Sequence, residues 1–219
     1  RDSNSIAFIN PDAAFVAQKM DDERAAGQLR GVLHGIPIVI KDNIDTADKM
    51  MTTAGSLALD GARVQRDANL VSRLREGGAI ILAKTNLSEW ANFRSTKSCT
   101  GWSSRGGQVR NAYAIDRTPG GSSSGSAVAV ARSFCAGAIG TETDGSIVVP
   151  AAMNSLVGIK PTVGMVSRTG VIPISFSQDT AGPIAKTVTD ASTILSVLMG
   201  HDPADSSSKD LKQGFPRKF

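Results

Sequence analysis

Three consecutive serines between glycines stand out in the segment 118-TPGGSSSGSAVAVAR-132, which runs directly into a small apolar stretch. A serine hydroxyl on a tight turn can act as a nucleophile in acyl transfer. A flexible Gly/Ser linker is a second interpretation, although both flanks are apolar and the segment is too short to separate domains. A phosphate-binding loop is a third, but the P-loop lysine and the G-x-G-x-x-G spacing are both missing. The chemistry then depends on which base could activate a serine here.

One candidate base is a histidine. The stretch 121-GSSSG-125 matches the G-x-S-x-G nucleophile turn of α/β-hydrolases, with Ser123 as the nucleophile. That mechanism needs an acid and then a histidine downstream, and His201 is the only histidine that follows. Short matches of this kind arise by chance in serine-rich segments, and an isolated histidine is more often a surface residue. An esterase that uses Ser123 and His201 stays open as an alternative.

The other candidate base is a lysine. Lys41 directly follows the β-branched run 36-IPIVI-40, which predicts a buried strand. Burial disfavours the charged form of a lysine and lowers its pKa. Lowering that pKa from about 10.4 to about 8 costs roughly 3 kcal/mol, which the fold must supply. Most lysines are solvated surface charges, so Lys41 becomes a base only if a nucleophile lies beside it.

A second serine-bearing turn supplies a further nucleophile. Ser146 lies in 140-GTETDGSIVVPAAMN-154, after a predicted strand and a glycine and at the expected start of a short helix. The backbone N–H groups of residues 143–146 could stabilise a developing oxyanion, at about 3 kcal/mol per donor. A helix cap is the plainer role for Ser146.

These residues require elements that position them. Apolar periodicity and stop signals predict helices at 11–27, 67–78, 126–132 and 189–200, the last with Thr189 as its N-cap. Strands are expected at 36–40, 79–84 and 136–143, and Thr85 or Asn86 is expected to cap the segment 87–93. The alternation of helices and strands favours an α/β sandwich with a largely parallel sheet. One domain is expected over residues 1–200, with a loose tail or linker at 201–219.

Composition narrows the class of protein. The chain has 219 residues, 41% hydrophobic and 20% charged, and a formal net charge of +4. The last eleven residues hold four basic and one acidic side chain, which account for +3 of that charge. The rest of the chain therefore offers no basic face, and a nucleic-acid partner is not expected. Two cysteines and two histidines without metal-ligand spacing predict no metal site. No apolar run has membrane-spanning length. We expect a cytoplasmic protein. Because the chain starts at Arg1 and not at Met, the removal of an upstream segment stays open.

Three blocks in order carry a family resemblance: 35-GIPIVIKDN-43, 119-PGGSSSGSA-127 and 140-GTETDGSIVVPA-151. With them the chain resembles the amidase signature family, whose members hydrolyse amides with a Ser–cis-Ser–Lys triad. The resemblance implies a three-layer α/β/α sandwich with a mixed, largely parallel sheet and no cofactor. It implies Ser146 as the acyl-accepting nucleophile, Ser122 rather than Ser123 as the bridging serine in a cis peptide, and Lys41 as the general base. Its oxyanion hole corresponds to the N–H groups of Thr143, Asp144, Gly145 and Ser146.

Two departures from the family pattern indicate a branch. Asp144 stands where many members have a second glycine, and Val148 stands where many have an arginine. The segments 140-GTETDGSI-147 and 175-SFSQDTAGP-183 together look most like bacterial peptide amidases, which release ammonia from C-terminally amidated peptides. Loss of the arginine argues against an acidic substrate and against the subunit that amidates glutamyl-tRNA. We therefore expect an amidase for neutral carboxamides, with a peptide or small-molecule amide as substrate and no membrane partner.

The family's domain normally continues well beyond position 219. A fragment that needs the missing C-terminal part of its own fold, or a homo-oligomer, is therefore expected as well. A catalytically incomplete fragment that acts only as a binding or assembly module is the non-enzymatic alternative.

Overall fold

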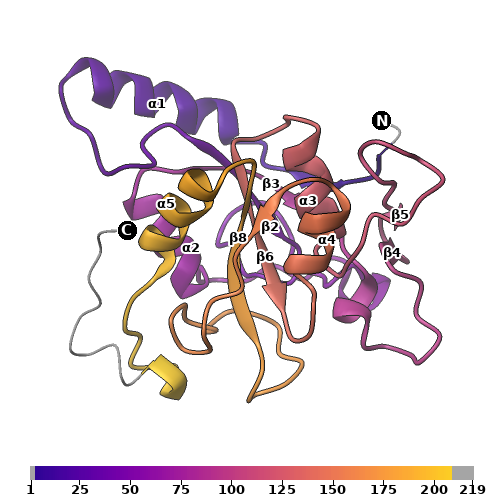
Figure 1. The fold of residues 1–219 in the computed structure, drawn as a ribbon. Coiled ribbons are helices and arrows are strands. Elements are labelled where there is room, and N and C mark those ends of the chain that lie inside the picture. The colour runs from indigo at the N-terminus through magenta and orange to yellow at the C-terminus, as the bar shows by residue number, and fades with distance from the viewer. Residues whose placement is uncertain (1–2, 209–219) are drawn as a thin grey trace.

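A six-stranded mixed sheet forms the centre of the computed structural model, which describes residues 3–208 (Figure 1). The strand order across the sheet is β1-β3-β2-β6-β8-β7. A separate two-stranded sheet pairs β4 with β5. The strands are β1 (Ile6–Ile9), β2 (Pro37–Lys41), β3 (Ile80–Thr85), β4 (Trp102–Ser103), β5 (Gly107–Gln108), β6 (Gly137–Glu142), β7 (Val157–Gly158) and β8 (Thr180–Ala185).

The strand directions make the sheet largely parallel. β2 runs parallel to both β3 and β6, with Lys41 beside Thr85 in register. β1 is antiparallel to β3, β8 is antiparallel to β6, and β7 is antiparallel to β8. It follows that β2, β3, β6 and β7 share one direction, which confirms the predicted mixed, largely parallel sheet.

Helices cover both faces of this sheet. They are α1 (Ala13–Ala25), α2 (Asn69–Glu76), α3 (Ser124–Ala131), α4 (Val148–Met153) and α5 (Val188–Leu198), with short 3₁₀ turns at Leu57–Leu59 and Glu89–Asn92. On one face, α2 and α5 bury their apolar residues against Ile38, Ile40 and Ile139. On the other face, α3 and the start of α4 pack against Val39, Ala83 and Ala138 (Figure 1). These are the three layers of the predicted α/β/α sandwich.

The alternation of side chains along a strand decides on which face of the sheet Lys41 and Lys84 lie. On β2, Ile38 and Ile40 face α2 and α5, whereas Val39 faces α3. Because side chains alternate along a strand, Lys41 lies on the α3 face with Val39. On β3 the register shifts between Ile81 and Ala83, which pair with the consecutive residues Ile38 and Val39. Ile81 and Ala83 therefore face opposite sides, and Lys84, next to Ala83, lies on the face opposite to Lys41.

The structure corrects three details of the predicted elements. The segment 87–93 contains only the 3₁₀ turn Glu89–Asn92, whose central residues have positive φ angles, and no α-helix. The last helix is capped by Thr187, whose side chain accepts a hydrogen bond from Asp190 N, and not by Thr189. The N-cap residue of α4 is Ile147, so a capping role does not account for Ser146.

The expected loose tail begins as packed structure. Asp202, Asp205 and Ser208 are buried. Asp205 forms an ion pair with Arg168 at 2.7 Å, and Asp202 accepts a hydrogen bond from the Ser167 hydroxyl at 2.6 Å. Residues 201–208 therefore continue the domain, because these carboxylates bind to Ser167 and Arg168. The remainder of the predicted tail, 209–219, lies outside the described residues.

Candidate active site

Lys41 is the last residue of β2 and is fully buried. Its Nζ lies 2.7 Å from Ser122 Oγ, 2.8 Å from Thr141 Oγ1 and 3.2 Å from the Thr141 carbonyl oxygen. The lysine is thus held between the start of α3 and the neighbouring strand β6. The structure brings together the predicted base and the predicted bridging serine.

The electrostatic surroundings of Lys41 favour its neutral form. Burial lowers the pKa of Lys41 from its ordinary value to about 7, while the negative charges of Glu142 and Asp179 act in the opposite direction and raise it. A pKa near neutrality leaves a large fraction of the amine unprotonated at physiological pH. A neutral amine in contact with a hydroxyl can accept its proton, which is the behaviour of a general base.

The turn before α3 presents Ser122 to Lys41. The Gly121–Ser122 peptide bond is cis, and Gly120 has a φ of +68°. A Cβ atom on Gly120 would approach Pro150 Cα to 2.7 Å, so a glycine is required where this turn touches α4. The Ser122 carbonyl accepts a hydrogen bond from Ser88 N at 3.1 Å. The glycines therefore permit a tight turn, and the backbone contact fixes the direction of the serine.

Ser123 has a different role from its neighbour. Its hydroxyl donates to the Thr141 carbonyl at 3.1 Å and accepts from Thr141 N at 3.2 Å, and the residue is fully buried. His201 lies on the α2 side of the sheet, where its carbonyl accepts a hydrogen bond from Arg73. The structure does not bring Ser123 and His201 together, so the esterase alternative with this pair is wrong. Ser123 instead fastens the turn to β6.

Ser146 follows β6 on a turn that a carboxylate organises. Glu142, the last residue of β6, accepts hydrogen bonds from Gly145 N at 2.9 Å, Ile147 N at 2.7 Å and Val148 N at 3.0 Å. Ser123 N donates to the Ser146 carbonyl at 3.1 Å, so the residue after Ser122 is bonded directly to Ser146. Ser146 itself is buried, with 4% exposure. The three predicted catalytic side chains therefore lie on segments that contact one another.

The predicted set of oxyanion donors needs one correction. The Gly145 N–H already donates to Glu142 and is not free to bind a ligand. Within residues 3–208, the N–H groups of Thr143, Asp144 and Ser146 have no acceptor at hydrogen-bonding distance. Asp144 is exposed, as expected for a carboxylate that must point away from a developing negative charge. Three of the four predicted donors remain available.

Sequence reasoning missed Thr141, Glu142 and Asp179 as parts of this site. Asp179 precedes β8 and accepts a hydrogen bond from Thr143 Oγ1 at 2.6 Å. Glu142 could have been found, because a carboxylate at the end of a predicted strand and four residues before Ser146 can satisfy the N–H groups of the next turn. Asp179 carries no such local signal, since its partner lies 36 residues away in the chain.

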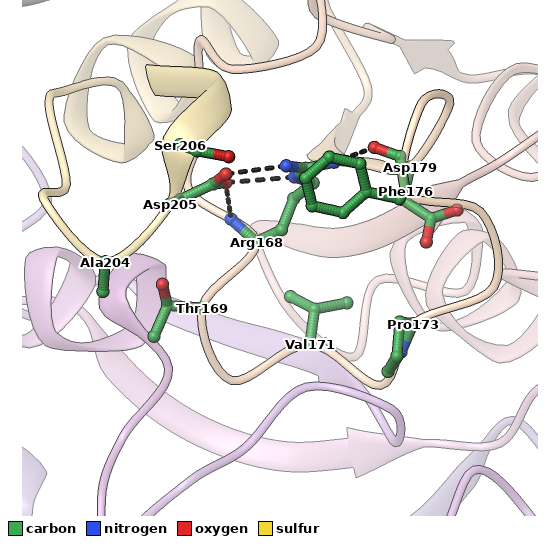
Figure 2. Close-up of a pocket in the computed structure, with 9 residues that line it drawn as sticks. All are labelled: Arg168, Thr169, Val171, Pro173, Phe176, Asp179, Ala204, Asp205 and Ser206. Atoms are coloured by element: carbon green, nitrogen blue, oxygen red, sulfur yellow. Dashed lines mark hydrogen bonds and ion pairs between the residues drawn. The ribbon is translucent and has the colours of Figure 1, made fainter. Parts of the chain in front are cut away.

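A cavity of about 270 Å³ adjoins the loop that contains Asp179. It lies between the 168–179 segment and residues 204–206. Figure 2 shows Phe176 beside the Arg168 guanidinium, and Asp205 binds the same guanidinium from the other side. The guanidinium carbon lies 4.8 Å from the centre of the Phe176 ring. The cavity thus has an aromatic wall and charged groups, and Asp179 belongs both to its lining and to the Thr143 contact.

The side chains that commonly hold metals are dispersed in the part of the chain that the structure describes. There, no group of three or more His, Cys, Asp or Glu side chains is placed to hold a metal ion. Cys99 and Cys135 are both free, and burial raises the pKa of the Cys135 thiol to about 12. Over the same residues, none of the helices combines the length and apolar character needed to span a bilayer.

Comparison with known proteins is consistent with this geometry. The family model described as Amidase matches residues 1–218. A probable amidase of Arabidopsis thaliana is 52% identical over 215 residues, which cover 97% of this chain and 42% of the relative. The solved structure of a peptide amidase from Stenotrophomonas maltophilia is 58% identical with a TM-score of 0.93, and the match covers 99% of this chain and 43% of that one.

The relatives also include glutamyl-tRNA amidotransferase subunits, the branch that the missing arginine at position 148 disfavours. A glutamyl-tRNA(Gln) amidotransferase component of Acidothermus cellulolyticus is 44% identical over 208 residues, which cover 94% of this chain and 40% of the relative. The chain spans about two fifths of the length of the relatives it matches. Since the family model matches almost the whole chain and the three sequence blocks meet at one site, the chain belongs to the amidase signature family.

Proposed function

We propose that this chain carries the catalytic centre of an amidase that hydrolyses neutral carboxamides through an acyl-enzyme. The observation that supports it most directly is the contact of 2.7 Å between Lys41 Nζ and Ser122 Oγ, made by a buried lysine whose pKa is lowered to about 7. The similarity to amidases over nearly the whole chain supports the same reaction.

In the proposed acylation, neutral Lys41 accepts the proton of Ser122 while Ser122 accepts that of Ser146. Ser146 Oγ then forms a bond to the amide carbonyl carbon, and the carbonyl electrons move onto its oxygen. The N–H groups of Thr143, Asp144 and Ser146 stabilise this oxyanion. The proton returns through Ser122 to the amide nitrogen, the C–N bond breaks, and ammonia or an amine leaves.

The proposed deacylation repeats these transfers with water. Water gives one proton to the Ser122–Lys41 pair and attacks the ester carbonyl carbon, and the bond to Ser146 Oγ breaks. Ser146 regains a proton, and the carboxylic acid is released. The overall change is one amide plus one water to one acid plus ammonia or amine, with no redox step.

C-terminal peptide amides are the substrates that we favour. The 58% identity to the Stenotrophomonas peptide amidase supports this choice. Val148 supports it as well, because an exposed apolar residue two positions after Ser146 offers no positive charge to an acidic substrate. The amidotransferase relatives keep transamidation as the competing assignment within the same family. Because the match covers only part of each relative, we propose that the rest of the amidase fold, or a second copy of the chain, completes the substrate pocket.

Covalent labelling tests the proposed nucleophile. We expect a fluorophosphonate to modify Ser146, as located by peptide mass spectrometry, and we expect Lys41→Ala and Ser122→Ala to reduce the labelling rate at least a hundredfold. Lys19→Ala, which removes an exposed lysine from α1, is the matched control and should label like the wild type. A wild-type chain that stays unlabelled, also in the presence of the remaining amidase fold, would favour the binding or assembly module instead.

Release of ammonia tests the substrate class. We expect a C-terminally amidated dipeptide to be hydrolysed faster than glutamine, because glutamine places charged groups beside the amide. Faster hydrolysis of glutamine would favour the amidotransferase branch.

A further inference from the structure

Asp179 joins two segments that are far apart in the chain. It is buried, with 8% exposure, in the turn before β8. Its Oδ1 accepts the hydrogen bond from Thr143 Oγ1 at 2.6 Å. Its Oδ2 accepts from Ile174 N at 2.8 Å and from Ser175 N at 2.9 Å. One carboxylate therefore holds the loop after β6 and the turn that carries Phe176.

The hydrogen bond between Thr143 and Asp179 adds a second support to the loop after β6, which carries the proposed nucleophile Ser146. Glu142 already binds the N–H groups of Gly145, Ile147 and Val148 at one end of that loop. Thr143 lies at the other end, and its side chain bonds to Asp179. Hydrogen bonds to a carboxylate are shorter and stronger than those between neutral groups. With both ends held, the free N–H groups between them keep a fixed direction.

The same carboxylate acts on the base through space. Lys41 is subject to two negative charges, Glu142 from β6 and Asp179 from the turn before β8, and both raise its pKa against the effect of burial. The remaining buried charges near β2, Asp42 and Lys84, pair with each other, and Lys84 lies on the opposite face of the sheet. Asp179 thus reaches the oxyanion donors through a hydrogen bond and the base through its charge.

Asp179 also lines the cavity beside the site. The turn whose N–H groups it binds carries Phe176, which forms the aromatic wall next to Arg168 (Figure 2). A substrate group that enters this cavity would therefore contact the segment that Asp179 connects to Thr143.

We propose that Asp179 is a positioning residue of the amidase site: through Thr143 it fixes the oxyanion donors, and it links them to the wall of the adjoining cavity. The proposal rests on the proposed amidase function, because it assigns Asp179 a part in the reaction at Ser146.

The first test removes only the hydroxyl of Thr143. In Thr143→Val, we expect the rate of fluorophosphonate labelling at Ser146 to fall about tenfold, because misplaced donors stabilise the transition state less well. Thr143→Ser keeps the hydroxyl and should label within about threefold of the wild type. Thr189→Val makes the same chemical change at an exposed position of α5 and serves as the control. Equal rates for Thr143→Val and the wild type would overturn the proposal.

The second test separates position from charge. Labelling requires neutral Lys41, so its rate should rise with pH through the pKa of Lys41. Asp179→Asn removes a charge that raises this pKa, so we expect the midpoint of the profile to move to lower pH and the maximal rate to fall. Thr143→Val leaves the charge in place and should keep the midpoint of the wild type. A midpoint that does not move in Asp179→Asn would contradict the inferred action on Lys41.

A third measurement does not depend on acylation. Hydrogen exchange of the peptide covering residues 143–149 should become at least threefold faster in Thr143→Val and return to the wild-type rate in Thr143→Ser. Unchanged exchange would show that Asp179 does not hold the loop, whatever the labelling result. A wild-type chain that is never labelled would instead count against the proposed function.

Discussion

Ser122 and Ser123 are adjacent in the chain, but their hydroxyl groups have different roles. Ser122 Oγ faces Lys41, whereas Ser123 Oγ is bonded to both polar groups of the Thr141 backbone. The G-x-S-x-G pattern alone favoured Ser123, because it records residue types and not directions. The direction is set by the hydrogen bond between the Ser122 carbonyl and Ser88 N and by the contact of the turn with β6 and α4.

The lowered pKa of buried Lys41 should affect the stability of the protein as well as the proposed catalysis. The pKa of Lys41 is lowered from the ordinary value of 10.5 to about 7, so between these pH values the unfolded chain binds more protons than the folded one. The free energy of unfolding should therefore rise with pH over this window, and this residue contributes on the order of 5 kcal/mol to the rise. The contribution is fully present above about pH 10.5 and is lost as the pH falls through 7.

Urea unfolding of the wild type and Lys41→Met from pH 6 to pH 10 checks this sign. We expect the methionine variant to be the more stable protein at pH 6 and to lose that advantage as the pH rises. Taking the difference between the two proteins cancels the titration of all other groups. A difference that stays constant with pH would show that Lys41 titrates normally in the folded protein.

At the scale of elements, the strands that position the site were the most predictable parts. The β-branched run before Lys41 and the apolar run 79–84 fold as β2 and β3. β8 gave no such signal, because its sequence TAGPIA contains a glycine and a proline. Gly182 is needed because a Cβ there would approach the Ile159 carbonyl oxygen to 2.2 Å. β7 pairs with Ile184 and Ala185, and Pro183, which has no N–H group, takes part through its carbonyl, which accepts a hydrogen bond from Ile159 N at 3.1 Å.

The contacts between elements were harder to predict than the elements. The positions of the proposed triad followed from sequence blocks that keep a local spacing, whereas the hydrogen bond between Thr143 and Asp179 depends on how β6 and β8 pair. The packing of residues 201–208 likewise depends on two side chains of the 167–168 segment. Local patterns do not encode such partners, so sequence reasoning could not supply them.

The buried ion pair of Lys84 and Asp42 should hold the segment that follows β2. Lys84 Nζ donates to the Ile44 carbonyl at 2.6 Å and to Thr52 Oγ1 at 3.1 Å, and lies 3.7 Å from Asp42 Oδ1. Burial lowers the pKa of Lys84 and raises that of Asp42, while each charge opposes the shift of the other. Removing one partner of a buried pair leaves an uncompensated charge.

We therefore expect Lys84→Met to lower the free energy of unfolding by about 3–5 kcal/mol at pH 7. The double variant Lys84→Met with Asp42→Asn should recover part of this loss, because it removes the unpaired carboxylate. Denaturant unfolding of the two single variants and the double variant measures the coupling. Strictly additive effects would mean that the two side chains do not interact.

At the scale of the whole molecule, α4 presents three exposed apolar residues at the surface. Val148, Val149 and Met153 are 41%, 40% and 49% exposed. This helix follows Ser146 directly, and the chain spans about two fifths of the relatives that it matches. Apolar groups gathered at a surface favour association in water.

We expect the chain to associate as its concentration rises and Val149→Lys to reduce this association, as measured by light scattering. Val188→Lys places the same charge on another exposed valine, at the start of α5, and should have a smaller effect. Both positions are exposed, so the urea midpoint should change little. Equal scattering for the two variants would place the contact outside α4.

The pairing of β6 with β8 has a consequence for the order of events during synthesis of the chain. Lys41 and Ser122 leave the ribosome early, but Asp179 reaches Thr143 only after β8 has been made and has paired with β6. Pairings between distant segments form late, because the chain between them must first be ordered. In a nascent chain that ends before β8, the loop that carries Ser146, the proposed nucleophile, would thus lack its hydrogen bond to Asp179. The proposed oxyanion donors would then take up their fixed arrangement only after β8 has been synthesised.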